Sequence, residues 1–391
     1  MDFLNTQASK YGDLAGYYQL MADLYQKKLW HQLTEELGQI LARREFNQGR
    51  NMIDLYENFI SKFEGKLNQL KFVQIASVIS QQYYPSRPFK HDELNAAIKF
   101  MEFICEKRGR LGEEAYLVAQ MSVAQLLIKF GDTKSMQRAQ KIIDEAQPVL
   151  QSLEGSGAET VVNSSFYRVS CEYYKVVGPA DEFYRAFIQF LAYTPQETME
   201  PEVQRQLATD MSLAAIVGEN VFNFGEVIAQ PILKVLDGTN MGWLHELLKV
   251  FSAGDIDQFT NLCVKNKQAM DAQPVLVQNL ELIKQKIALL CLMQIVFVRP
   301  PDDRVISLTH IAQVTRLDVD QAEWLLMKAM SKGLIKGKID QVEGMVHISW
   351  LKPRVLDREQ LATVKDKLAL WKENVDKTLM FIESETPDLF Q

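Results

Sequence analysis

The sequence predicts a mostly α-helical protein: an N-terminal α-solenoid of helix pairs, similar to TPR or HEAT repeats, followed by a winged helix and a long C-terminal helix. Three observations support this prediction. Apolar residues recur at helical spacing from residue 11 to residue 298. Turn glycines recur at drifting, near-regular intervals, as paired-helix repeats require; they are Gly131, Gly178, Gly218 and Gly254. Residues 304–350 then read as a short strand, two helices and two alternating strands.

Composition places the chain among ordered globular proteins. It has 391 residues, of which 47% are hydrophobic and 24% are charged, so two or three packed domains are expected. The net charge of −7 argues against nucleic acid as the main partner. The cysteines form no CxxC pair and lie in apolar helical patterns, which predicts buried thiols in a reducing, intracellular compartment; they are Cys105, Cys171, Cys263 and Cys291.

Neither a signal peptide nor a transmembrane segment is expected. The first residues lack the basic start and the apolar core of a signal peptide. The longest apolar candidate, Ile287–Val298, is shorter than the ~20 residues that a helix needs to cross a bilayer.

The expected helices of the solenoid come in pairs joined by short turns. Residues 11–42 and 51–82 each predict a helical hairpin, because apolar residues form one stripe on each arm. One pair cannot bury both of its faces, so stacking of neighbouring pairs must supply the core. Further helices are expected at residues 92–107, 112–130, 136–153, 161–177 and 180–193.

Helices continue up to the winged helix, at residues 202–217, 243–252, 256–268 and 278–298. The last of these is apolar nearly all round, so we expect it to be buried between the solenoid and the winged helix. We predict three parts: a solenoid over 1–177; a second domain over 178–353, with a helical part (178–298) and the winged helix (299–353); and a C-terminal helix with its tail over 354–391.

Capping signals and alternation define the winged helix. Ser307 precedes the first helix, Asp318 or Asp320 begins the second, and Gly333 follows its last turn. The core side of the two helices is expected to include Val314 and Val319. In the strands, Ile335, Ile339, Val346, Ile348 and Trp350 are expected to point inward, whereas Lys336, Lys338 and Asp340 point outward; Glu343 and Gly344 form the turn.

A winged helix can bind DNA, with the N-terminal turn of its second helix nearest the bases. Here that turn carries Asp318, Asp320 and Glu323, which a polyanion repels. We therefore interpret Lys336 and Lys338 as solvated, and we expect an edge of the wing sheet to accept a strand from another chain. Trp324 lies opposite the apolar side of its helix, where it either packs on the C-terminal helix or anchors a partner.

The C-terminal helix carries an apolar heptad series with no evident partner in the chain. About 25 residues span roughly 38 Å, which is more than a small winged helix can cover. The spacing of three and four favours a bundle with helices of other chains, although packing on the chain's own solenoid is the alternative. The apolar positions are Leu361, Val364, Leu368, Trp371, Val375 and Ile382.

The sequence shows no motif for catalysis, metal binding or cofactor binding. No two of the histidines form HxH or HExxH, and neither GxSxG nor a phosphate loop is present. Cys291 lies in an apolar helix, where a thiol is inert. We expect no catalytic residue, no metal and no cofactor, and therefore no enzyme.

The order of helical repeats, winged helix and C-terminal helix resembles the PCI domain, and specific segments resemble its members among the non-ATPase lid subunits of the 26S proteasome regulatory particle. The resemblance is spread over nearly the whole chain. It is carried by YQKKLWHQLTEEL (25–37), LYENFISKFEGKLNQL (55–70), VFNFGEVIAQPIL (221–233), IKQKIALLCLMQIVF (283–297), SKGLIKGKIDQV (331–342) and HISWLKPRVL (347–356).

The resemblance implies a non-catalytic scaffold in ubiquitin-dependent protein degradation, in cytoplasm and nucleus. Such subunits join other PCI subunits through their winged helices, and their C-terminal helices enter a shared bundle near the lid deubiquitinase pair and a ubiquitin receptor. A COP9 signalosome subunit, a translation initiation factor subunit and a nucleic-acid adaptor are the alternatives. The expected interface residues are Trp324, Lys336, Lys338, Ile339, Val346, Ile348, Leu361, Val364, Leu368, Trp371 and Val375.

Overall fold

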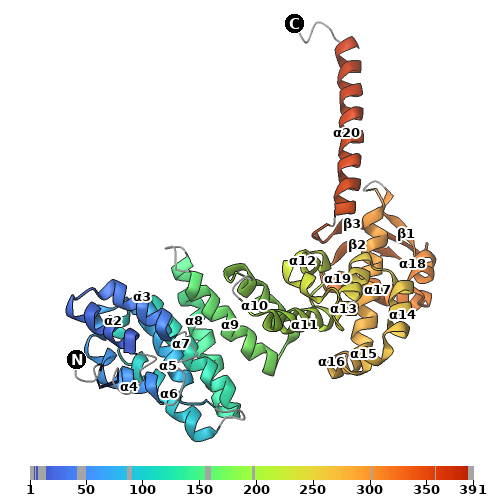
Figure 1. The fold of residues 1–391 in the computed structure, drawn as a ribbon. Helices are drawn as coiled ribbons and strands as arrows, with labels where there is room; N and C mark the ends of the chain where they lie inside the picture. Colours follow the sequence, from blue (N-terminus) through green and yellow to red (C-terminus); the bar gives the residue numbers. More distant parts are fainter. Residues whose placement is uncertain are drawn as a thin grey trace. The chain divides into compact units, whose positions relative to one another are not determined.

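The computed structural model describes residues 4, 6–7, 15–41, 50–85, 90–154, 160–195, 199–300, 303–356 and 358–385 (Figure 1). Its contacts divide the chain into two compact units, residues 1–197 and 198–391. Both units are built mainly from helices, and the one sheet in the described residues has three strands. The predicted fold class is thereby confirmed. No helix in the described part of the chain combines the length and the apolar character that crossing a membrane requires.

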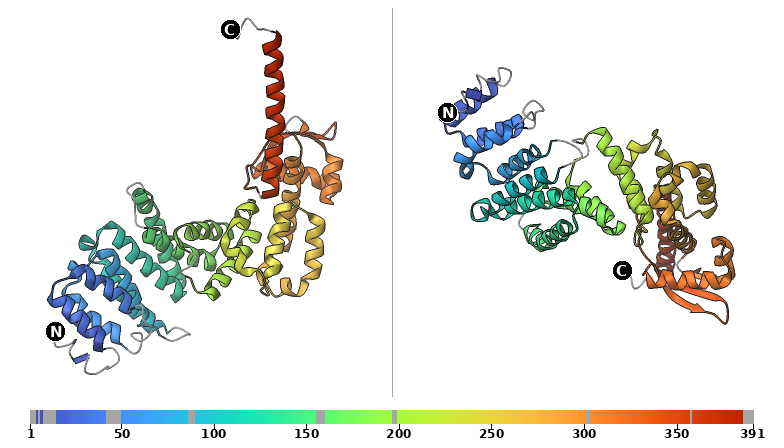
Figure 2. Two further views of the ribbon diagram at one scale, coloured as in Figure 1. Left: turned by 45° about the horizontal axis from the view of Figure 1, so that its top comes forward. Right: turned by 90° about the horizontal axis from the view of Figure 1, so that it is seen from below.

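The N-terminal unit is a stack of helices in which each packs on its neighbours (Figure 2). Its core lies between the helices and includes Met21, Leu37, Val73 and Met101. Gly131 ends α7 and has a positive φ, as its expected turn requires. The helices are α2 (Ala15–Gln26), α3 (Trp30–Leu41), α4 (Asn51–Asn58), α5 (Gln69–Gln81), α6 (His91–Cys105), α7 (Arg108–Phe130), α8 (Thr133–Glu154), α9 (Thr160–Val177) and α10 (Ala180–Tyr193).

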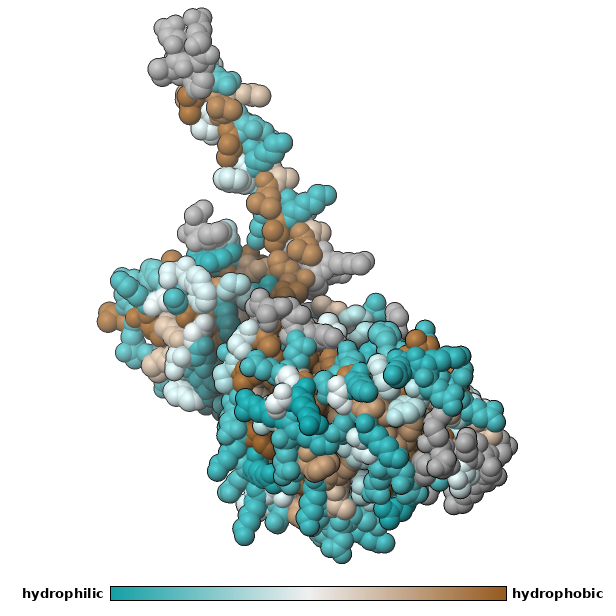
Figure 3. All heavy atoms as spheres, turned by 90° about the vertical axis from the view of Figure 1, so that its left-hand side faces the viewer, coloured by the Kyte–Doolittle hydropathy of each residue, from teal (hydrophilic) through white to brown (hydrophobic). Residues whose placement is uncertain are grey.

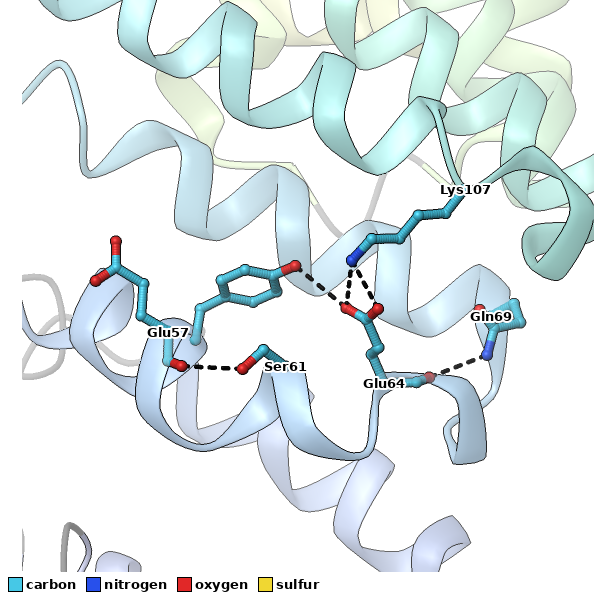
Figure 4. A network of polar contacts seen from close by, with 6 residues as sticks. Glu57, Ser61, Glu64, Gln69 and Lys107 are labelled. Atoms are coloured by element: carbon cyan, nitrogen blue, oxygen red, sulfur yellow. Dashed lines mark hydrogen bonds and ion pairs between the residues drawn. The ribbon is translucent and has the colours of Figure 1, made fainter.

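The second expected hairpin differs from its prediction. Two 3-10 turns, η3 (Ile60–Lys62) and η4 (Glu64–Lys66), replace the end of its first arm. A polar network holds the second turn (Figure 4): Lys107 Nζ donates to Glu64 Oε1 at 2.6 Å and to Oε2 at 2.8 Å, and Tyr56 OH donates to Oε2 at 3.2 Å. This carboxylate binds partners from α4 and from the turn between α6 and α7, so it joins successive layers of the stack.

The C-terminal unit begins with a helical part whose centre is α17 (Leu280–Val298). This helix is buried along most of its length, as its apolar sequence predicts, and packs against helices of the helical part and of the winged helix. Its neighbours before it in the chain are α11 (Pro201–Val217), α12 (Phe224–Ala229), η6 (Pro231–Leu236), α13 (Gly242–Ala253), α14 (Ile256–Lys265), α15 (Lys267–Asp271) and α16 (Pro274–Gln278).

The winged helix follows in the expected order. It consists of β1 (Val305–Ser307), α18 (Leu308–Thr315), α19 (Val319–Ser331), β2 (Ile335–Asp340) and β3 (Met345–Leu351). Ser307 Oγ accepts from the His310 N–H, Asp318 and Gln321 form a capping box, and Gly333 has a positive φ after α19. Val314 and Val319 are 38% and 43% exposed, so their predicted burial is wrong; Thr315 is buried instead.

A buried lysine closes the C-terminal end of α11. Lys286, on α17, donates from Nζ to the carbonyls of Ala215 at 2.6 Å, Ile216 at 3.2 Å and Gly218 at 2.5 Å. These last carbonyls of a helix have no partner within it, and they carry the negative end of its dipole. The ammonium group also lies 5.1 Å from the ring centroid of Phe224. One cation therefore fixes the end of α11 against the central helix.

Replacing Lys286 with methionine tests this contact. The substitution keeps a long side chain but leaves buried carbonyls without a donor, so the free energy of unfolding should fall by about 1.5–3 kcal/mol. Urea unfolding followed by circular dichroism measures it. Lys284→Met, at an exposed position of the same helix, is the matched control and should stay within about 0.5 kcal/mol of the parent. Equal effects of the two substitutions would contradict the assigned role.

Candidate assembly surfaces

The wing sheet has the order β1-β3-β2, so β3 is the central strand and its backbone is paired on both sides. Val346 and Ile348 lie on β3 and are buried. Neither their side chains nor their backbone is therefore available to another chain. The outer edge of β2 is the side of that strand that no strand of the described residues covers. Lys336 and Lys338 are exposed on β2, and Ile339 is half-buried.

A bulge changes the expected direction of Trp350. Gly337 pairs with Ile348 while Lys336 pairs with Trp350, so Ser349 is an extra residue on β3. The alternation shifts by one beyond it, and Trp350 turns outward, where Lys336 Nζ lies 5.0 Å from its ring centroid. The predicted inward position of Trp350 is therefore wrong. A Cβ at Gly337 would meet the His347 carbonyl oxygen at 2.3 Å, so only glycine fits beside the bulge.

Trp324 does not pack on the C-terminal helix in the structure. It is 51% exposed, and Lys328 Nζ lies 4.9 Å from its ring centroid. Met327, on the next turn of α19, is 49% exposed. Its role as an anchor for a partner stays a prediction.

The C-terminal helix, α20 (Arg358–Glu385), exposes an apolar stripe along its length. It has 28 residues, which corresponds to about 42 Å. Of the predicted stripe, Leu368 is 59% and Trp371 67% exposed, and Val364 is partly exposed. Figure 3 shows hydrophobic atoms following the helix. Leu361, Val375 and Ile382 of the predicted stripe are exposed too, and Leu379, which the prediction did not include, adds to it.

The segment before α20 is held firmly by the helical part of the same unit. The Val355 N–H donates to Asn223 Oδ1 at 2.9 Å, and a Cβ at Gly225 would meet the Val355 carbonyl oxygen at 2.1 Å. Arg354 donates to Gln294 Oε1 at 2.5 Å, with its guanidinium 4.3 Å from the ring centroid of Phe297. The chain therefore leaves the winged helix from a fixed point.

A cleft in the C-terminal unit offers no catalytic arrangement. It has a volume of about 460 Å³ and is lined by α17, α18 and the start of α14 with the turn before it; Cys291, His310 and Asp257 are among its residues. Burial raises the pKa of the Cys291 thiol to about 11, and the carboxylates of Asp255 and Asp257 add to the rise. A cysteine nucleophile requires the opposite shift. Among the described residues, no group of three or more His, Cys, Asp or Glu could hold a metal ion.

The comparisons with known proteins agree with this architecture. Residues 17–248 match the family of PSD13 N-terminal repeats, and residues 263–350 match the PCI domain. The 26S proteasome non-ATPase regulatory subunit 13 homolog B of Arabidopsis thaliana is 40% identical, with 100% of this chain and 98% of the relative covered. The chain belongs to the family of 26S proteasome non-ATPase regulatory subunit 13, which carries a PCI domain.

Two further members of the subunit 13 family support the same conclusion. The Dictyostelium discoideum protein is 36% identical over 96% of this chain and 95% of its own length. The probable regulatory subunit rpn9 of Schizosaccharomyces pombe is 30% identical over 100% of this chain and 97% of its own length. Among PCI proteins, the segments quoted in the sequence analysis resemble those of the ninth non-ATPase subunit of the regulatory particle. The match to rpn9 confirms this resemblance.

Sequence patterns did not reveal the residues that position these surfaces. Lys286, Asn223 and Gly225 carry no motif, because their partners lie far away in the chain. Gln82 is similar: its Oε1 accepts from the N–H groups of Met52 at 2.9 Å and Ile53 at 3.2 Å at the start of α4. The sequence signal for Lys286 is weak, because Lys284 and Gln285 of the same helix are polar as well.

Substituting alanine for Gly337 should destabilise the winged helix. The added Cβ collides with a backbone oxygen, so we expect a loss of about 1–3 kcal/mol, measured as a lower midpoint of thermal unfolding. Gly38→Ala is the control, because Gly38 lies exposed within α3 with open space around its Cβ position; it should be neutral or stabilise by up to about 1 kcal/mol. An unchanged midpoint for Gly337→Ala would show that the bulge tolerates a side chain.

Stability should decrease as the pH rises from 8 to 9.5. Burial, with Glu102 nearby, raises the pKa of Cys105 to about 12, and that of Cys291 is about 11, whereas thiols in an unfolded chain ionise near 8.5. The unfolded chain thus loses protons first, which favours unfolding as the pH increases. Urea midpoints at both pH values measure the effect. The Cys105→Ala, Cys291→Ala double variant should show a shallower decrease; an identical slope would contradict the assignment.

Proposed function

We propose that this chain is a non-catalytic scaffold subunit of the 26S proteasome regulatory particle, in the lid, acting in ubiquitin-dependent protein degradation. Its relatives are named as regulatory, non-ATPase subunits of the 26S proteasome, and both parts of its architecture match that family over most of the chain. The observation that carries the proposal is the apolar stripe of α20, which the rest of the C-terminal unit leaves exposed.

Burial of this stripe is the main driving force for assembly. Its side chains include leucines, valines, an isoleucine and a tryptophan, all more than 40% exposed apart from Val364. Burying each large apolar side chain fully contributes about 1.5–3 kcal/mol before ordering costs. Spacing of three and four residues matches the seam of a helical bundle. Helices of neighbouring subunits would therefore cover the stripe.

The winged helix supplies a second, lateral contact. The outer edge of β2 is available for pairing with a strand or loop of a neighbouring PCI subunit. Lys336 and Lys338 on the same strand disfavour pairing between identical copies, since like charges would face each other. The edge thus favours a different partner over a second copy of this chain.

We also propose particular partners, compartments and domain roles for the chain. The bundle would include the lid deubiquitinase pair, a ubiquitin receptor would lie nearby, and the complex would act in the cytoplasm and the nucleus. The functional boundaries at 177/178 and 353/354 remain part of this proposal. They divide the chain by role, whereas the compact units meet at residues 197 and 198.

Charging the stripe should block assembly without unfolding the chain. In Leu368→Asp, Val375→Asp, both substitutions lie on the stripe; in the control, Ala369→Asp and Asn374→Asp add the same charge on other faces of α20. All four positions are exposed, so circular dichroism should be unchanged in both variants. Co-purification of a tagged chain with lid subunits should fall at least tenfold for the first variant alone. Normal incorporation of that variant would contradict the bundle.

A further inference from the structure

The recognition helix of the winged helix presents a surface that differs in chemistry from a DNA-binding one. We define the recognition-helix face as Asp320, Glu323, Trp324 and Met327 of α19 together with Val342 of the wing turn. The four helical positions lie on neighbouring turns of one side of α19. Trp324 and Met327 are about half-exposed, and Val342 is 98% exposed.

One hydrogen bond joins the wing turn to this helix, and two others order the turn itself. Gln341 Nε2 donates to Glu323 Oε2 at 3.2 Å. Asp340 Oδ1 accepts from the N–H groups of Val342 and Glu343, both at 3.1 Å. The turn is therefore ordered beside α19, so Val342 and the two apolar residues of the helix belong to one surface.

The charge on the wing-turn side of this face is negative, whereas Lys328 Nζ lies 4.9 Å from the ring centroid of Trp324 toward the C-terminal end of α19. Asp318, Asp320 and Glu323 surround the N-terminal half of the face, and Glu343 stands at the wing turn. No ion pair between residues that the structure describes neutralises any of them. Lys328 and Lys332 lie toward the other end of α19, where Lys328 binds Gln285 and Lys332 binds the Glu219 carbonyl. The part of the face nearest the wing turn thus joins an exposed tryptophan to uncompensated carboxylates.

This combination selects the kind of partner. A duplex would bring phosphates against carboxylates, which is unfavourable. Trp324 and Met327, three residues apart on successive turns, can hold the apolar ridge of another helix. Lysine or arginine side chains flanking that ridge would reach Asp320 and Glu323 in partly desolvated ion pairs. An aromatic anchor within a polar rim is the usual composition of a protein interface.

We propose that the recognition-helix face is a docking site for a lysine- or arginine-rich amphipathic helix of a protein partner, at the position where a DNA-binding winged helix holds its duplex. The occupant is thus a protein segment, and it uses a surface separate from the β2 edge and from α20. The proposal does not depend on which complex contains the chain, so it can fail while the proposed function stands.

Fluorescence anisotropy with the full-length chain tests the proposal. The probe is a fluorescein-labelled, 18-residue peptide of leucine and lysine, with leucines at helical spacing on one side. Trp324→Ala, Met327→Ala should weaken its binding at least about tenfold, as loss of an interface anchor does. Val264→Ala, at a 74% exposed valine elsewhere in the same unit, is the matched control and should leave the affinity unchanged. Both variants should keep the parent's thermal midpoint, because the substituted side chains lie outside the core.

Charge reversal supplies the second measurement. Asp320→Lys, Glu323→Lys should lose binding of the leucine–lysine peptide and gain binding of the same peptide with glutamate in place of lysine. Leu368→Ser, Val375→Ser on α20 should leave binding unchanged, which separates this face from the bundle stripe. The proposal is overturned if the parent chain does not bind the peptide, if the α20 variant loses binding instead, or if a 20-base-pair duplex competes for the same residues.

Discussion

The C-terminal unit depends on one buried cation. Lys286 places its ammonium group against three carbonyls at the end of α11 and beside aromatic rings. A charge in such a place is stable only because those oxygens replace its water shell. The contact fixes residues 215–224 relative to α17. Lys332 at the end of α19 binds the carbonyl of Glu219 in the same segment, so the winged helix is tied to the same point.

The contacts around Lys286 and Lys332 help to position the proposed binding surfaces. Asn223 lies in the segment that Lys286 fixes and Gly225 directly follows it; both hold Val355 just before α20 begins. Contacts of the preceding segment thus determine where the chain leaves the winged helix, whereas the side chains of α20 from residue 361 to 385 are exposed, apart from the partly exposed Val364. Rigid support beneath an exposed apolar surface reduces the ordering cost of binding. The unit therefore has a rigid base, and its exposed apolar surfaces are suited to burial against other proteins.

Local patterns predicted most of the fold, and long-range contacts account for what they missed. The helices, the caps at Ser307 and Asp318 and the stripe of α20 follow from residues a few positions apart, so the sequence reveals them. The partners of Lys286 lie 68 to 71 residues away, and no periodicity reports such a distance. Trp350 was misplaced because one extra residue at Ser349 reverses the alternation. Val346 and Ile348 were correctly expected to point inward, but strand order, which the sequence does not reveal, puts them on the central strand.

The bulge in the wing has a consequence for the proposed pairing through the β2 edge. An extra residue increases the local twist of a strand and bends it away from a flat plane. A flat, regular edge can recruit copy after copy into an open fibre. A bent edge stacks poorly on itself, so each junction must be made with a surface shaped to match it. In the proposed pairing through the β2 edge, such a shape favours one matching neighbour over repeated addition of identical copies.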